Sequence, residues 1–402
     1  MRILVVDKLA PFVAGRLQDL GGVVTVDPTA KDAALTAKVA ALDPEVVIVR
    51  STKVTGADIG AGKALSLVIR AGAGVNTIDL GAASARGVYV ANCPGKNAIA
   101  VAELAVGLLL ACDRRIPDNV NRLREGKWDK KAFGSARGLN GRRIAVLGTG
   151  QIGREFIERA QALGMSVTAW SRSLTAEAAA AMGVARADTP EAAVAGAHAV
   201  SVHLALAKET RGRIGESVFA AMKSGAIFVN TARAEVVDHD ALLRAIDEKK
   251  LKVGLDVFPD EPSAGQADYS HPVVSHPSVY GTHHIGASTD EAEEAVGEEV
   301  VRIVAAYKQG APIPNCVNLA TRTPATHQLV VRHADRVGVL AGVLGVLRES
   351  GVNVEDMQNI IFSGGEAACA RIAVKGAVGD DALARIQSLP NIFAASVVAL
   401  KE

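Results

Sequence analysis

The sequence has few cysteines, no long apolar segment and no dense run of one charge. Its four cysteines are scattered, without the close pairs of a disulfide framework or a zinc site: Cys93, Cys112, Cys316 and Cys369. We therefore expect a reducing compartment, the cytoplasm, and no bound metal. The longest apolar segment, residues 98–112, contains Glu103 and is too short to cross a bilayer.

Neither positive nor negative charge is in excess. The 44 basic and 43 acidic residues leave a formal net charge of +1, and no Lys/Arg cluster favours nucleic acid or a membrane surface. The apolar run before Asp7 is too short for a signal peptide and predicts a first strand. We expect a small-molecule partner that is attracted by local charge.

Short β-branched runs alternate with Ala-rich helical stretches over the first three quarters of the chain. This order predicts an α/β fold with parallel sheets that are covered on both faces. At 402 residues and 49% hydrophobic residues, the chain can form two or three cores. The expected strands are 3–6, 45–49, 66–69, 88–91, 143–148, 166–170, 199–204, 227–230 and 254–258.

The order of these segments predicts one Rossmann-like unit inserted into another. The outer, flavodoxin-like unit takes residues 1–96 and 286–318, and the inner unit takes residues 97–285. Long helices connect them, one from Ala98 and one from near Ser288, where Ser288 and Glu291 have capping-box spacing. A proline-containing linker then leads to residues 319–402, whose βαββαβ pattern predicts a ferredoxin-like domain.

A glycine motif predicts the nucleotide site. Gly148, Gly150 and Gly153 in "GTGQIG" stand between a strand and a helix, with Gln151 and Ile152 between the second and third glycines. Such glycines permit a tight turn, close approach of the backbone to a pyrophosphate, and close helix packing. The inner unit is therefore expected to bind a dinucleotide, with the phosphates at the helix N-terminus.

The residues after the next strand bear on the choice of dinucleotide. Ser171 stands where an acid commonly holds the ribose hydroxyl of NAD, and Arg172 and Ser173 follow it. A guanidinium group can bind the 2′-phosphate of NADP, assisted by the serine hydroxyls. Arg172 can equally point into solvent above NAD. The cofactor is NAD or NADP, with these residues favouring acceptance of NADP.

Arg233, Glu261 and His284 follow successive strands of the inner unit, in "NTAR", "DVFPDEP" and "HIGAST". With "RAGAGVNTIDL", "CPGKNAIAVAEL" and "LNGRRIAVLGTGQIG", these segments make the chain similar to the D-2-hydroxyacid dehydrogenases. Over nearly its whole length it resembles those that oxidise D-3-phosphoglycerate in serine biosynthesis and end in an ACT domain. The outer unit then corresponds to the substrate-binding domain.

The resemblance implies a role for each of these residues. Arg233 binds the substrate carboxylate, Glu261 orients and charges the imidazole, His284 exchanges the proton at C2, and Asp256 holds the nicotinamide carboxamide. General chemistry agrees, because a histidine working near neutral pH suits proton exchange and an arginine can clamp a carboxylate. Three departures from the family pattern, at Ala205, His283 and Ala234, remove no reacting group.

Two further sites are expected in the outer unit and the tail. Arg50 and Arg70 match basic residues near the substrate phosphate, although salt-bridged arginines at strand ends are an alternative. Backbone N–H groups of Ala73, Gly74 and Val75 can hold the carboxylate. In the tail, His333, Asp335 and Asn353 match positions that bind L-serine between paired ACT domains. Because Asp335 and Val337 depart from the motif, assembly without serine binding stays open.

Two other functions stay open at this point. An NADPH-dependent glyoxylate or hydroxypyruvate reductase is the enzymatic alternative, because "WSRS" is more typical of those reductases. An NAD(H)-sensing protein of the corepressor type is an alternative of another class, which the intact set of Arg233, Glu261 and His284 disfavours. The resemblance also implies a homodimer or homotetramer.

Overall fold

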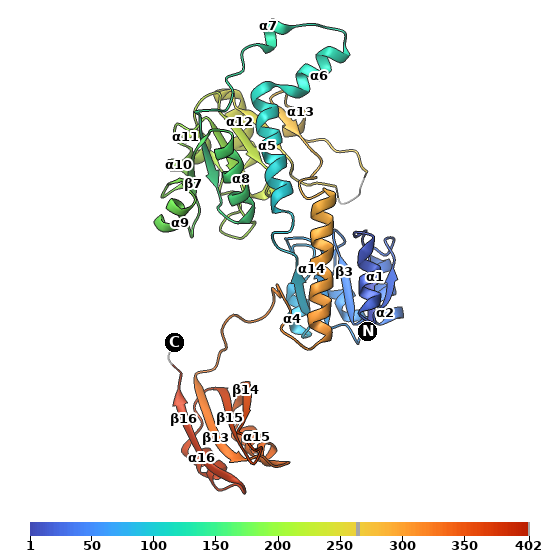
Figure 1. Cartoon of the computed structure of the whole chain (residues 1–402), viewed down its shortest axis with the longest axis vertical. Helices are drawn as coiled ribbons and strands as arrows, with labels where there is room; N and C mark the ends of the chain where they lie inside the picture. The colour runs from blue at the N-terminus through green and yellow to red at the C-terminus, as the bar shows by residue number, and fades with distance from the viewer. Residues whose placement is uncertain (263–265, 401–402) are drawn as a thin grey trace. The chain divides into compact units, whose positions relative to one another are not determined.

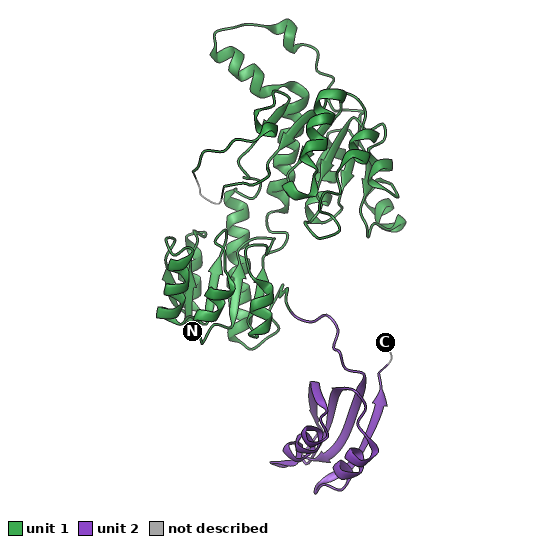
Figure 2. Ribbon diagram, turned by 180° about the vertical axis from the view of Figure 1, so that it is seen from behind, with its two compact units in different colours: residues 1–318 green, residues 319–402 purple. Residues whose placement is uncertain are grey.

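The computed structural model describes residues 1–262 and 266–400 (Figure 1). They divide into two compact units, Met1–Asn318 and Leu319–Glu402, which are coloured separately in Figure 2. The first unit contains two parallel sheets, and the second contains one antiparallel sheet. No helix among the described residues is both long enough and apolar enough to span a bilayer.

The first sheet has five parallel strands in the order β2-β1-β3-β4-β5, which is the flavodoxin-like order. The strands are β1 (Arg2–Val5), β2 (Val23–Val26), β3 (Val46–Val49), β4 (Leu67–Arg70) and β5 (Tyr89–Asn92). The helices of this part are α1 (Phe12–Asp19), α2 (Ala33–Leu42), α3 (Gly56–Ala61), α4 (Leu80–Ala85) and α14 (Asp290–Lys308). Val300, Ile303 and Val304 of α14 are buried in one core with strands β1, β3 and β4. The segment after residue 286 therefore belongs with this sheet.

The second sheet has seven parallel strands in the order β12-β11-β10-β9-β6-β7-β8. Counted from β6, six of them follow the doubly wound order 3-2-1-4-5-6, so the order reverses between β6 and β9. The strands are β6 (Arg143–Leu147), β7 (Ser166–Trp170), β8 (Ala185–Arg186), β9 (Ala199–Val202), β10 (Ile227–Asn230), β11 (Lys252–Leu255) and β12 (Val279–Gly281).

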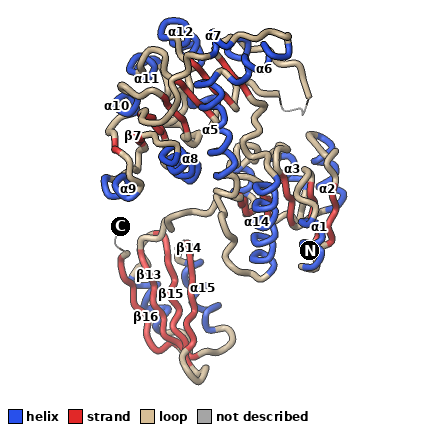
Figure 3. Tube along the Cα trace, turned by 45° about the horizontal axis from the view of Figure 1, so that its top comes forward, coloured by secondary structure: helices blue, strands red, loops and turns tan. Residues whose placement is uncertain are grey.

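Helices lie on both faces of these sheets, as Figure 3 shows. Those of the second part are α5 (Ala98–Arg114), α6 (Ile116–Arg124), α7 (Lys130–Phe133), α8 (Gln151–Ala162), α9 (Ala176–Ala181), α10 (Pro190–Val194), α11 (Glu216–Ala221), α12 (His239–Lys249) and α13 (Pro272–Ser275), with the 3₁₀ turn η1 (Ala234–Val236). Helix α5 packs closely on β11: a Cβ atom added at Gly254 would lie 2.9 Å from the Leu108 Cβ. The apolar segment from Ala98 is thus a buried core helix.

The second unit has the order βαββαβ, with the four strands arranged β14-β15-β13-β16. Its elements are β13 (His327–Ala334), α15 (Val339–Glu349), β14 (Asn353–Ile361), β15 (Ala367–Lys375), α16 (Asp380–Gln387) and β16 (Ile392–Ala399). Leu329, Val343, Ile372 and Ile386 lie in its core, which joins both helices to one face of the sheet.

Several expected boundaries are wrong. The strand predicted at 199–204 ends at Val202, and the one predicted at 254–258 is β11, which ends at Leu255. Strands β2, β8 and β12 were not predicted, because β2 is partly exposed and the other two are very short. The capping box at Ser288 and Glu291 is also wrong. The Ser288 amide closes a turn to Ile285, so Thr289 caps α14 by accepting from the Ala292 amide at 3.2 Å.

Candidate active site

His284 and Glu261 form a hydrogen-bonded pair beyond the carboxyl ends of strands β11 and β12. The His284 Nδ1 lies 2.6 Å from the Glu261 Oε2, and the other carboxylate oxygen accepts from the Phe258 amide at 2.7 Å. Partial burial raises the pKa of the Glu261 carboxyl. The hydrogen bonds from His284 and Phe258 and the charge of Arg233 outweigh that effect, so the pKa lies below its ordinary value. A carboxylate therefore fixes one ring nitrogen and leaves Nε2 for chemistry.

Asp256 holds the loop that carries the imidazole. It is 1% exposed, and its two carboxylate oxygens accept from the Thr282 hydroxyl at 2.6 Å, the Ile285 amide at 2.9 Å and the Gly286 amide at 2.8 Å. Between these donors, His284 has a φ of +52°, an unusual conformation for a residue with a side chain. Asp256 therefore anchors a strained loop, and the contact with the nicotinamide carboxamide that the resemblance implies for it stays a prediction.

A buried asparagine shapes the turn that presents Arg233. Asn230, fully buried at the end of β10, accepts from the Ala232 amide at 3.0 Å and donates to the Arg233 carbonyl at 2.9 Å. The guanidinium reaches the glycine-rich loop after β4, because a Cβ added at Gly74 would lie 2.9 Å from the Arg233 Nη2. The turn thus directs a cation from the second sheet toward the first.

The loop of residues 71–75 offers backbone donors beside that cation. The Asn92 side chain donates to the Ala73 carbonyl at 2.5 Å, and the Cys93 amide donates to the Gly72 carbonyl at 2.9 Å. Among the described residues, the amides of Ala73, Gly74 and Val75 donate to no protein acceptor. A fixed loop with free N–H groups next to a guanidinium is a suitable carboxylate site.

Arg70 and Arg50 add positive charge behind this loop. Burial, and then the charges of Arg233 and Arg50, lower the pKa of Arg70 to about 10. The Arg70 Nε has no hydrogen-bond partner among the described residues, and an added Cβ at Gly72 would overlap its guanidinium. Arg50 pairs with Glu293 at 2.6 Å, as in the salt-bridged alternative. Arg70 nevertheless lies within range of the charges of both Arg233 and Arg50.

Asp7 positions Arg50 by binding the loop after β3. It is 8% exposed and accepts from the amides of Arg50, Ser51 and Thr52 at 2.6–3.0 Å, and from the hydroxyls of Ser51 and Thr52. Burial raises the pKa of the Asp7 carboxyl, but these hydrogen bonds outweigh it, so the pKa lies below its ordinary value.

We expect Asp7→Asn to lower the free energy of unfolding at neutral pH by about 1–3 kcal/mol, because the neutral amide keeps only one of the two oxygens that accept from these donors. The folded-state pKa is below that of the unfolded chain. The stabilisation is therefore complete above the unfolded-state pKa and is lost as pH falls through the folded-state value. Urea unfolding from pH 7 downward should show the variant approaching the wild type, while the exposed Asp19→Asn control shows no such trend. A gap that stays constant with pH would contradict the role of the ionised carboxylate.

The glycine motif has the geometry that a dinucleotide requires. Gly148 has a φ of +106°, and a Cβ there would lie 2.5 Å from the His203 carbonyl oxygen. A Cβ at Gly153 would overlap the Gly148 carbonyl, whereas one at Gly150 would meet nothing within 4 Å. Gly150 is the residue before α8, so the open space lies at the N-terminus of that helix. The three glycines thus fit a turn, a close helix contact and a phosphate approach.

The comparisons with known proteins agree with this geometry. Residues 106–286 match the family description "D-isomer specific 2-hydroxyacid dehydrogenase, NAD binding domain". The chain belongs to the D-2-hydroxyacid dehydrogenase family.

Similar proteins of this family include D-3-phosphoglycerate dehydrogenases of Archaeoglobus fulgidus and the rat. The first is 38% identical over 74% of this chain and 56% of its own length, the second 37% over 81% and 60%. The chain thus spans less than two thirds of their length. The structure of NAD⁺-bound 3-phosphoglycerate dehydrogenase from Entamoeba histolytica covers 79% of this chain and 99% of its own, at 25% identity and a TM-score of 0.66.

Ser171, Arg172 and Ser173 are the residues predicted to lie at the adenine side of the dinucleotide. They follow β7, next to the glycine motif after β6, because β6 and β7 pair in parallel and the Gly148 amide donates to the Trp170 carbonyl at 2.8 Å. Arg172 and Ser173 are exposed, and no acidic side chain of the described residues pairs with Arg172. Gln151 and Ile152 lie in the first turn of α8.

The structure does not bring the three tail residues together within one chain. His333 is 1% exposed, and its Nε2 lies 3.2 Å from the Asn359 Oδ1. His333 of β13 pairs with Ala368 of β15, which pairs in turn with Ile361 of β14. Asn353 is at the other end of β14, eight residues or roughly 27 Å from Ile361. Asp335 is exposed just after β13. A site from His333, Asp335 and Asn353 therefore needs a second copy of the tail.

Two positioning residues were missed by sequence analysis. Asn230 is the last residue of β10 and Asp7 stands two residues beyond β1, and each holds a loop through hydrogen bonds. The available signal was their type and place: a small polar side chain directly after a buried apolar run, at the edge where ligands bind parallel sheets.

Proposed function

We propose that this protein is a D-3-phosphoglycerate dehydrogenase, which oxidises 3-phosphoglycerate to 3-phosphohydroxypyruvate in serine biosynthesis with NAD or NADP. The observation that carries the proposal is a series of neighbouring cations: the charge of Arg233 acts on Glu261 of the His284–Glu261 pair, and the charges of Arg233 and Arg50 both act on Arg70. A substrate with a carboxylate at one end and a phosphate at the other matches such a set of cations. The similarity to curated D-3-phosphoglycerate dehydrogenases supports it.

The bound dinucleotide supplies the acceptor for the hydride that leaves C2. In oxidation, the Nε2 of His284 takes the proton of the C2 hydroxyl, and the Glu261 carboxylate stabilises the resulting imidazolium. In reduction, the same imidazolium returns the proton. Arg233 and the amides of Ala73, Gly74 and Val75 bind the carboxylate and fix which face of C2 is presented. Arg70 and Arg50 bind the phosphate.

The residues that hold the dinucleotide are Gly148, Gly150, Gln151, Ile152 and Gly153, with Ser171, Arg172 and Ser173 at the adenine side. The NAD-binding family match supports NAD, and the absence of an acid at Ser171 favours acceptance of NADP as well. Arg172 then clasps the 2′-phosphate. Asp256 acts at the nicotinamide end mainly by keeping the His284 loop in place.

We expect Arg172→Ala to weaken NADPH binding by about 1.5–3 kcal/mol, roughly 10- to 100-fold, because one charge-assisted contact is lost. NADH lacks the 2′-phosphate, so its affinity should change little and serves as the internal control. Fluorescence titration with both cofactors measures the two effects. Equal losses for NADH and NADPH would contradict the 2′-phosphate role.

Ser171, Arg172 and Ser173 also favour a second candidate, an NADPH-dependent glyoxylate or hydroxypyruvate reductase. Steady-state rates with 3-phosphoglycerate, glyoxylate and hydroxypyruvate, each with both cofactors, separate the two. Absence of turnover with 3-phosphoglycerate alongside intact reduction of the unphosphorylated acids would reject the leading proposal. An NAD(H)-sensing corepressor role is tested by His284→Ala, which should leave such a role intact while abolishing turnover.

For the tail we propose an ACT domain that pairs with a second copy in a homodimer or homotetramer. His333 and Asp335 of one chain would then meet Asn353 of another, with L-serine as the effector. The βαββαβ order supports the domain type. Thermal shift and activity titration with L-serine test the effector, and the four free thiols fit the proposed cytoplasmic location.

A further inference from the structure

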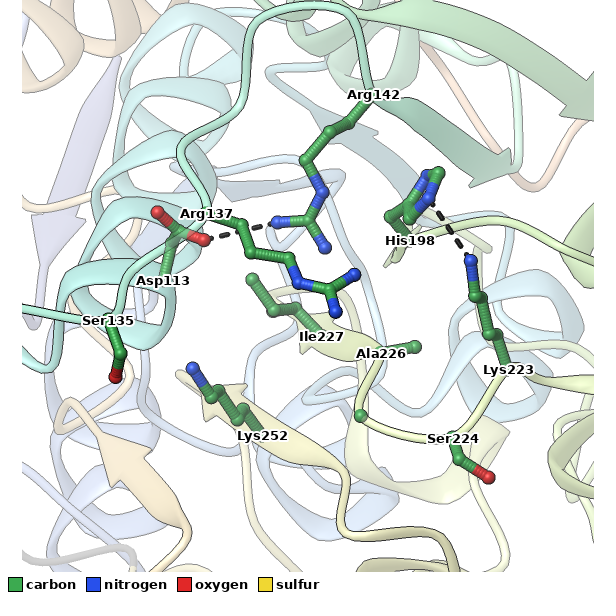
Figure 4. A pocket seen from close by; sticks show the side chains of 11 residues that line it. Asp113, Ser135, Arg137, Arg142, His198, Lys223, Ser224, Ala226, Ile227 and Lys252 are labelled. Atoms are coloured by element: carbon green, nitrogen blue, oxygen red, sulfur yellow. Dashed lines mark hydrogen bonds and ion pairs between the residues drawn. The ribbon is translucent and has the colours of Figure 1, made fainter.

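A basic pocket lies at the amino ends of strands β6, β9, β10 and β11 (Figure 4). The glycine motif and Arg233 lie at the other end of these strands, the carboxyl end. Arg142 precedes β6, His198 precedes β9, and Lys252 opens β11. Because the strands are parallel and four or five residues long, their amino and carboxyl ends lie roughly 13–17 Å apart. The pocket is therefore separate from the proposed catalytic site.

Positive charge dominates the lining of the basic pocket. Its charged or titratable side chains are Arg137, Arg142, Lys223, Lys252, His198 and Asp113. The single carboxylate is already used: Asp113 is 4% exposed and accepts from the Arg142 Nη1 at 3.1 Å and the Gly138 amide at 3.0 Å. Among the described residues, no acid forms an ion pair with Arg137, Lys223 or Lys252.

The cations lie close enough to influence one another. The Lys223 Nζ is 3.3 Å from the His198 Nε2, and Figure 4 shows Arg137 and Lys252 extending into the same space. Burial, and then the charges of Lys223, Arg142, Arg143 and Arg137, hold the pKa of His198 below its ordinary value. Repulsion between these neighbouring positive charges costs free energy, which a bound anion would offset.

The size and chemistry of the lining limit the anion. The cavity volume of about 210 Å³ lies below the roughly 300–1,000 Å³ of sites for drug-sized ligands, which suits a molecule of phosphate or small-acid size. The lining contains no Phe, Tyr or Trp ring on which a base could stack, but it does contain the hydroxyls of Ser135 and Ser224. A nucleotide is therefore a poor fit, and a small anion with two or three charges is a good one.

We propose that the basic pocket binds a small polyvalent anion, a phosphomonoester or a polycarboxylate, outside the catalytic cleft. Arg137, Lys223 and Lys252 provide the charge, while Arg142 is held in place by Asp113. This proposal does not depend on which hydroxy acid the enzyme oxidises.

Calorimetric titration of the full chain with inorganic phosphate, and separately with citrate, at constant ionic strength tests the proposal. We expect a site that persists in Arg233→Ala, which removes the active-site cation. Its affinity should fall at least tenfold in the double variant Arg137→Ala/Lys252→Ala. The tighter of the two probes identifies the class of anion.

The matched control is Arg244→Ala/Lys63→Ala, which removes the same two charge types at exposed positions elsewhere. Its isotherm should match that of the wild type. Circular dichroism and thermal midpoints check that the pocket variant is folded, and Lys252→Glu alone provides a second disruption. The proposal is overturned if neither anion binds, if all binding disappears in Arg233→Ala, or if pocket and control variants bind alike.

Discussion

His284→Ala is expected to lower kcat about 10²- to 10⁴-fold in both directions of the proposed reaction, because it removes the imidazole that we propose exchanges the C2 proton. The variant breaks the His284–Glu261 pair, in which Glu261 fixes Nδ1 of the imidazole. Asp256 holds the loop on both sides of His284, through Thr282 and Ile285. KM for the substrate should change much less, since Arg233 and the 71–75 loop remain. Steady-state kinetics in oxidation and in reduction measure both parameters.

The matched control is the adjacent histidine. His283→Ala removes the same side chain type from an exposed position of the same loop, and it should leave kcat within a few-fold of the wild type. The two histidines could not be separated by composition, only by the motif that follows the second. Equal losses in the two variants, or a larger loss in His283→Ala, would reject His284 as the proton-exchanging group.

Glu261→Gln tests the partner independently. The amide can still hydrogen-bond the imidazole but cannot stabilise its charged form, so ketone reduction should suffer and its rate should decline at lower pH than in the wild type. Burial raises the pKa of the Glu261 carboxyl, but the hydrogen bonds from His284 and Phe258 and the charge of Arg233 outweigh it and hold the pKa below its ordinary value. Activity profiles from pH 5 to 9 measure the shift. An unchanged profile would show that the carboxylate only orients the ring.

Local sequence patterns were sufficient to predict most of the parallel strands and the candidate residues that follow their carboxyl ends. Continuous apolar runs predicted β6, β7, β9 and β10 because buried parallel strands need no alternation. Glycine placement predicted the dinucleotide turn because only glycine fits at Gly148 and Gly153. The short edge strand β8 carries too few residues to show any period.

Contacts between distant segments could not be predicted. Asp7 binds residues 50–52, and Asp256 binds residues 282–286, so each carboxylate acts on a loop that sequence spacing does not connect with it. The basic pocket is another case, since its arginines and lysines come from three separate segments and each one alone has the features of an ordinary surface residue. The serine site of the tail stays a prediction that needs a second copy of the chain, because the register of β14 separates Asn353 from His333 within one copy.

Arg233→Ala is expected to lower kcat/KM about 10²- to 10³-fold, since losing a bidentate clamp on a carboxylate costs about 3–4 kcal/mol. Arg233→Lys keeps the charge but not the planar fork, so it should recover only part of the loss. The turn itself should survive in both variants, because Asn230 holds it through the Arg233 carbonyl and the Ala232 amide. Substrate titration at saturating cofactor separates KM from kcat.

Arg244→Ala is the matched control, because its guanidinium pairs with Glu216 in an exposed position on α12 and should contribute little. A second arm distinguishes the two anionic ends of the substrate. Removing Arg233 should weaken every 2-hydroxy acid, whereas Arg50→Ala should weaken 3-phosphoglycerate but spare unphosphorylated glycerate, because only the former carries a group for Arg50 to bind. If Arg50→Ala weakens both acids equally, Arg50 serves its ion pair with Glu293, and the phosphorylated substrate loses one of the cations on which its assignment rests.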